Sequence, residues 1–157
     1  MNALLLNKII FDFNSIYGNG YVLTASFLLL LIASYFDIKH MKIPNKLNLT
    51  FFIIRLLLCF VIGIEVGNLY GMIAGFLLLL IPAMIKNKPM GGDIKLMTVL
   101  GFYIGVKNLL ILLAGTIVFS MFYTAPNLIK KRERKDFPLA PFVLLSFISI
   151  ITISFIV

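Results

Sequence analysis

The chain has 157 residues, of which 61% are hydrophobic, and its mean hydropathy is +1.07. Because ordinary soluble domains are only about 45–50% apolar, this composition excludes a soluble globular protein and predicts one polytopic membrane domain. The formal net charge is +8, but the basic residues lie between apolar runs. Membrane orientation and contact with lipid headgroups therefore explain the basic residues better than nucleic-acid binding does. We expect no nucleic-acid partner.

Residues 1–19 mix apolar with polar side chains, which predicts an interfacial amphipathic segment or a half-helix rather than a span. Six apolar segments follow, at about 21–36, 47–66, 69–85, 94–105, 108–125 and 139–157. As a helix, the fourth would be about 18 Å long, which is shorter than the roughly 30 Å of hydrocarbon in a bilayer. The predicted fold is therefore all-α, with about six transmembrane helices, the fourth one short, and residues 20–157 forming one membrane-embedded domain.

The basic residues predict the orientation of these spans. Eleven of the 14 Lys and Arg lie in or beside three loops, and they are Lys39, Lys42, Lys46, Lys86, Lys88, Lys95, Lys130, Lys131, Arg132, Arg134 and Lys135. The positive-inside rule places all three loops in the cytoplasm. The sequence thus predicts a multi-pass protein of the cytoplasmic (inner) membrane with both termini outside.

Two of the six acidic residues stand at the edges of apolar runs. Asp37 ends the first predicted span and Asp93 directly precedes the fourth, so the predicted orientation puts both at the cytoplasmic membrane boundary, where water can reach them. A carboxylate at the end of a membrane helix is costly to desolvate and indicates function, preferably with a partner. Two carboxylates held close together cannot both stay charged cheaply, so one holds a proton while the other activates a water, as in an aspartic protease.

Each aspartate also has a purely structural interpretation. Asp37 would be a helix-end residue solvated by headgroups, and Asp93 would be the N-terminal cap of a helix that starts at Ile94. Their matched depth, and the glycines Gly91 and Gly92 before Asp93, favour a functional pair. Glycine lets another backbone approach closely, which suits a protease that holds an extended peptide, although a flexible loop would also use it.

Four further residues are candidates for supporting roles. Pro44 stiffens the loop after Asp37, and Asn45 is placed to cap the following helix. Lys95, two residues after the second aspartate, is placed either to tune it or to extend toward headgroups. Arg55 lies about 12 Å along the second span. A guanidinium at that depth should face protein or water, so we hypothesise that Arg55 points into the cleft below the aspartates.

Three segments resemble the type IV prepilin peptidases, a family of membrane-embedded aspartic proteases. Residues 37–47 read DIKHMKIPNKL and resemble the family's aspartate followed by a basic loop and Ile-Pro-Asn. Residues 91–96 read GGDIKL and resemble its G-x-G-D-x-K-L motif, except that Met90 stands where the first glycine would be. Residues 137–142, FPLAPF, resemble the proline-bearing start of the family's last helix.

The resemblance implies that Asp37 and Asp93 are the catalytic pair and that no metal or cofactor is needed. The implied substrates are precursors of pilins, pseudopilins or archaellins, which lose a short basic leader after a glycine at the cytoplasmic face. Many bacterial members also carry a domain with paired Cys-x-x-Cys motifs that is associated with N-methylation. Since this chain has one cysteine, it resembles the peptidase-only form.

Two alternatives stay open at this point. One is an intramembrane aspartic protease of the presenilin or signal-peptide-peptidase type, although Phe36 rather than Tyr precedes Asp37 and residues 138–140 invert the Pro-Ala-Leu motif of that class. The other is a channel, transporter or assembly subunit that uses the aspartates to bind ions or protons. The oligomeric state is not predicted.

Overall fold

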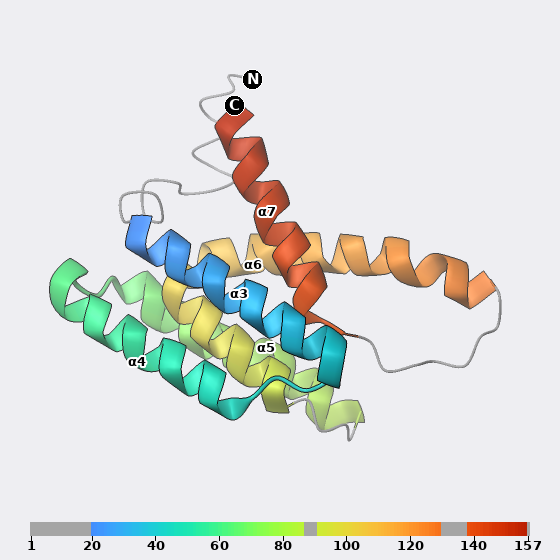
Figure 1. Ribbon diagram of the computed structural model, residues 1–157, viewed down its shortest axis with the longest axis horizontal. Helices are drawn as coiled ribbons and strands as arrows, with labels where there is room; N and C mark the ends of the chain where they lie inside the picture. Colours follow the sequence, from blue (N-terminus) through green and yellow to red (C-terminus); the bar gives the residue numbers. More distant parts are fainter. Residues whose placement is uncertain (1–19, 87–90, 130–137, 157) are drawn as a thin grey trace.

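The computed structural model describes residues 20–86, 91–129 and 138–156, and this part of the chain forms helices only. The helices are α3 (Gly20–His40), α4 (Asn45–Ile62), α5 (Val66–Lys86), α6 (Gly91–Ile129) and α7 (Ala140–Ile156), as drawn in Figure 1. The predicted all-α class is confirmed. The prediction for residues 1–19, the basic loop at 130–135 and Met90 lie outside the described residues.

Membrane spans are indicated by the length and composition of the helices. α3, α4, α5 and α6 are each long and apolar enough to cross a bilayer, and α7 has a shorter apolar stretch at Ala140–Ile153. The chain is therefore a polytopic membrane protein, as its composition predicts.

The long helix α6 is interrupted at Gly105, whose φ of 76° and ψ of 168° are not helical. In Figure 1 the part of α6 before this residue (yellow) and the part after it (orange) run in different directions. A φ of 76° is readily available only to glycine, which explains why the break falls here. Two helical segments thus meet at Gly105, and they correspond to the short fourth span and the fifth span predicted from the sequence.

One difference from the predicted boundaries that matters for the site is at the end of α3. The helix continues past Asp37 to His40 and then ends at Met41, which has a φ of 52°. Helix is also disfavoured just beyond, because Pro44 restricts the residue before it. Asp37 consequently lies one turn inside the helix, on its buried face, with a 5% exposed side chain. This carboxylate is therefore less exposed than its predicted place at the membrane boundary implies.

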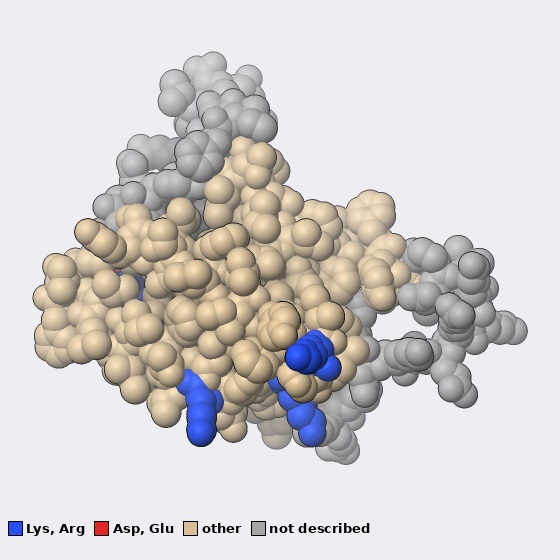
Figure 2. All heavy atoms as spheres, viewed as in Figure 1, with Lys and Arg blue, Asp and Glu red and all other residues tan. Residues whose placement is uncertain are grey.

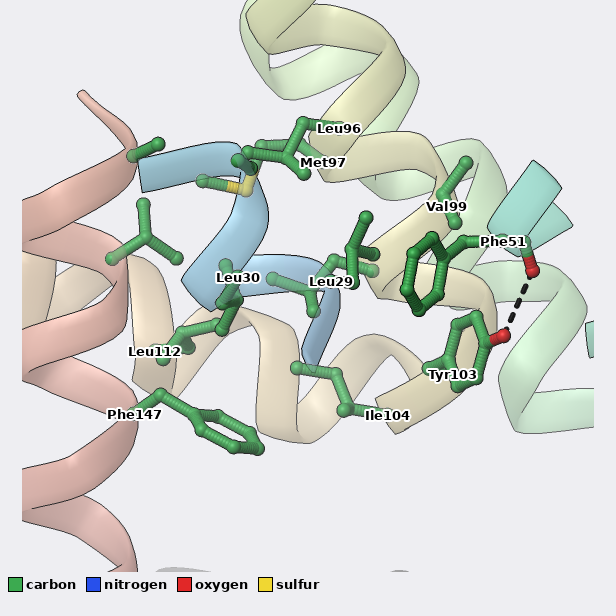
Figure 3. Close-up of a cluster of buried hydrophobic side chains, with 14 of the residues drawn as sticks. Leu29, Leu30, Phe51, Leu96, Met97, Val99, Tyr103, Ile104, Leu112 and Phe147 are labelled. Carbon is green, nitrogen blue, oxygen red and sulfur yellow. Dashed lines mark hydrogen bonds between the residues drawn. The ribbon is translucent and has the colours of Figure 1, made fainter. Parts of the chain in front are cut away.

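The core is shared by α3, α4, both parts of α6, and α7. Figure 3 shows Leu29 and Leu30 of α3 among side chains of α6, with Phe147 of α7 nearby. On the α4 side, the hydroxyl of Tyr103 donates a hydrogen bond of 2.8 Å to the carbonyl oxygen of Phe51. This bond satisfies the polar end of a fully buried aromatic ring and links the first part of α6 to α4.

Glycines bring α5 and the first part of α6 into backbone contact, and these two helices pack against each other more extensively than any other pair. Gly71 and Gly75 of α5 are four residues apart, as are Gly101 and Gly105 of α6. A Cβ added at Gly101 would overlap the carbonyl oxygen of Gly71, and one added at Gly75 would overlap that of Met97. Small residues at this spacing are typical of close helix pairs in membranes.

This contact generates a prediction for stability. Gly101→Leu should destabilise the protein by about 1–3 kcal/mol or more, because the added side chain forces the α5 and α6 backbones apart. Thermal unfolding of the detergent-purified protein measures the effect. Gly67→Ala is the matched control, because an added Cβ there has nothing within 4 Å. Equal stability of the Gly101 variant and the control would show that close packing of α5 on α6 is not required.

Candidate active site

Asp37 occupies the inward face of α3 because it continues a helical spacing of buried positions. These positions are Val22, Ser26, Leu29, Leu30, Ala33, Ser34 and Asp37. The carboxylate oxygen Oδ2 of Asp37 accepts a hydrogen bond of 2.9 Å from the backbone N–H of Ala140, the first residue of α7. The first N–H groups of a helix have no partner within it, so Asp37 satisfies one of them and joins α3 to α7.

Asp93 lies in the first turn of α6 and is partly exposed. Since α6 begins at Gly91, the interpretation of Asp93 as the cap of a helix starting at Ile94 is wrong. α3, which carries Asp37, packs against α6, and the segment that follows α3 approaches Gly92, the residue before Asp93. Asp37 and Asp93, from helices far apart in the sequence, therefore lie at the same end of these packed helices.

The start of α6 is fitted against the start of α4. An added Cβ at Gly92 would come within 3.3 Å of the Cβ of Ile43, so the glycine allows this approach. The side-chain nitrogen Nδ2 of Asn48 donates to the carbonyl oxygen of Gly92 at 3.3 Å. The ammonium group of Lys95 donates to Oδ1 of Asn45 at 2.9 Å.

The remaining loop residues stand at the edges of this contact. Pro44 precedes the first residue of α4 in an extended conformation, with a φ of −63° and a ψ of 131°, and makes no side-chain capping hydrogen bond. Gly91 is exposed, and an added Cβ there would meet open space. Close approach therefore involves Gly92 and not Gly91.

The three sequence segments that carry the family resemblance meet at this end of the molecule. The segment at 37–47 supplies Asp37 and the start of α4, the segment at 91–96 supplies Asp93, and the last segment supplies Ala140 at the start of α7. The backbone N–H of Ala140 and the side chain of Asn48 were not among the sequence-predicted site residues. An asparagine within an apolar helix is a sequence signal that could have identified Asn48. The role of Ala140 belongs to its backbone N–H, and a backbone group leaves no signal in the sequence.

Arg55 is not where the sequence hypothesis placed it. Its Nε donates to the carbonyl oxygen of Phe102 at 3.1 Å, and its guanidinium carbon lies 5.4 Å from the ring centre of Phe102. It lines a cavity of about 60 Å³ that is also lined by Glu65 and Asn68, beside the turn between α4 and α5. Its side chain thus faces the opposite end of α4 from the aspartates, where it ties α4 to α6.

Basic side chains lie at the end of the molecule that holds the aspartates. Lys39, Lys42, Lys46 and Lys95 are all exposed. Figure 2 shows basic side chains along the edge where α3 ends and α4 begins in Figure 1. Asp37, which is buried, and Asp93, which is partly exposed, therefore lie at an end of the molecule that also carries exposed lysines.

Known proteins with similar sequences share this segment of the chain. The family model described as the type IV leader peptidase family matches residues 24–125, a range that contains both Asp37 and Asp93. The chain is 35% identical, over 118 residues, to the prepilin leader peptidase/N-methyltransferase of Bacillus subtilis. This alignment covers 72% of the chain and 48% of the relative, so the chain spans about half the length of the curated relative that it matches.

No solved structure matches the chain. The family match covers well over half of the sequence, and the curated relative supports it independently. The chain therefore belongs to the type IV leader peptidase family.

Proposed function

We propose that this protein is an aspartic endopeptidase that removes the short basic leader from pilin-like precursors at the cytoplasmic face of the membrane. The observation that carries the proposal is the placement of Asp37 and Asp93 at the same end of the packed helices α3 and α6. Family membership supports leader peptidase activity, and the curated relative is named as a prepilin leader peptidase. The proposed substrates are the precursors of pilins, pseudopilins or archaellins.

In the proposed reaction the ionised carboxylate takes a proton from a water molecule, and the water oxygen attacks the carbonyl carbon of the scissile peptide. The protonated carboxyl donates its proton to the carbonyl oxygen, which gives a neutral tetrahedral diol. Collapse of the diol breaks the C–N bond, and a proton passes to the departing amine. This division of roles requires one proton shared between two carboxylates, which their proximity favours.

The cytoplasmic location is supported by charge. The exposed lysines at the aspartate end, Lys39, Lys42, Lys46 and Lys95, have the bias expected of cytoplasmic loops. A pilin-like substrate would then bring its apolar helix through the lipid, so that its leader meets the two carboxylates.

Isosteric amide variants test the catalytic pair. Asp37→Asn and Asp93→Asn should each reduce leader removal by about 10³-fold or more, since neither amide is able to exchange the required proton. The measurement is cleavage of a pilin precursor by membranes that contain each variant. The amide oxygen that Asp37→Asn introduces would still accept from the N–H of Ala140, so this variant should stay folded.

Glu65→Gln is the matched control, because it makes the same chemical change at an exposed acidic residue beside the α4–α5 turn. It should cleave at the wild-type rate. Undiminished cleavage by both aspartate variants would exclude the proposed mechanism.

The contact between Lys95 and Asn45 should support the first turn of α6, which carries the second aspartate. Lys95→Ala and Asn45→Ala should each lower the cleavage rate by about threefold to tenfold, because each removes the same hydrogen bond, worth roughly 0.5–1.5 kcal/mol. The double variant should be no slower than the single ones. Rates that multiply in the double variant would show that the two side chains act independently.

A further inference from the structure

Asn48 is an amide in the buried face of an apolar helix. It lies one turn into α4, and its side chain is 2% exposed. Nδ2 donates to the carbonyl oxygen of Gly92, the residue before Asp93, at 3.3 Å. This hydrogen bond links two segments that are 44 residues apart in the sequence.

Stability alone does not explain an asparagine at this position. Its other polar atom, Oδ1, is buried and has no hydrogen-bond partner. A buried acceptor without a partner is costly, whereas an apolar side chain of similar size would avoid that cost. Because most buried polar atoms are hydrogen-bonded, the unpaired Oδ1 of Asn48 needs an explanation, either a function or the positioning of a neighbouring residue.

The bonded carbonyl is placed where it controls Asp93. Because the peptide group is planar, the direction of the Gly92 carbonyl fixes the position of the Asp93 nitrogen and the start of its side chain. Gly92 has no side chain to hold it, and Ile43 lies close to where its Cβ would be. The amide of Asn48 supplies a directional contact that packing alone does not.

We propose that Asn48 is a positioning residue that holds the Gly92–Asp93 peptide so that the carboxyl of Asp93 faces Asp37. This role rests on the proposed peptidase function. Asn48 itself touches neither the substrate nor the reacting water, so its loss lowers turnover and leaves substrate binding unchanged.

The test compares Asn48→Ala with Asn48→Ser, which differ by a single hydroxyl donor. The substrate is a synthetic peptide that contains a basic leader, the cleavage-site glycine and the following apolar residues. Asn48→Ala should lower kcat by about tenfold to a hundredfold, since small misplacements of a catalytic group have effects of that size. Asn48→Ser, with room for a water that bridges the hydroxyl to Gly92, should lose only about threefold. KM should stay within about twofold of wild type in both variants.

Asn108→Ala is the matched control. Asn108 is also a buried asparagine of a membrane helix, with Nδ2 bonded at 2.8 Å to the carbonyl oxygen of Ile104 and Oδ1 without a partner. It lies just after the Gly105 break rather than beside the aspartates, so its variant should melt at a lower temperature and keep the wild-type kcat.

Three results would overturn the positioning role. They are a wild-type kcat in the serine and alanine variants, a rise in KM in place of a fall in kcat, or an equal fall in kcat in the Asn108 control. If the alanine variant does not fold, the serine variant still tests the positioning role. Wild-type turnover by the serine variant would contradict the proposal. Failure of the wild-type protein to cleave any leader peptide would instead refute the proposed function on which this role depends.

Discussion

A carboxylate that is removed from water must find polar partners within the protein, and the structure depends on how Asp37 meets this constraint. The carboxylate lies on the buried face of α3 and accepts the first N–H of α7. One interaction therefore joins two helices whose contacting residues are 103 positions apart. The same side chain lies at the end of the helices where α6 begins and carries Asp93, so the contact that holds α7 also belongs to the proposed catalytic site.

The second aspartate depends on a different kind of contact. α6 begins against the start of α4, where Gly92 permits close approach and the amides of Asn45 and Asn48 reach Lys95 and the Gly92 carbonyl. Farther along, α6 is held to α5 through glycine contacts and to α4 through Arg55 and Tyr103. The first part of α6 is thus held by contacts along its length, which suits a helix that carries a proposed catalytic group.

Much of this arrangement could be predicted from the sequence because its signals are local. Long apolar runs indicate the helices, and the glycine at 105 falls where the short fourth span ends. The two aspartates stand out because charges are rare in such a chain. The segments around residues 37 and 93 indicated the family, which the family model and the curated relative confirm.

The remaining features depend on contacts between distant segments. The burial of Asp37 follows from the extension of α3 to His40, which the apolar pattern alone did not predict. The depth of Arg55 is readable from the sequence and favours the aspartate cleft, but the direction of its side chain is set by the hydrogen bond to Phe102 of α6. The backbone N–H of Ala140 carries no side-chain signal at all.

Proximity of the two aspartates is the central claim, and crosslinking tests it without relying on activity. In a Cys59→Ala background, the pair Asp37→Cys and Asp93→Cys should be joined within one chain by a short bifunctional thiol reagent. The pair Asn45→Cys and Lys95→Cys, whose native side chains are hydrogen-bonded, calibrates the reaction. Efficient joining of the first pair is the expected result. Joining of the calibration pair alone, in protein that is folded and accessible to the reagent, would contradict a shared site.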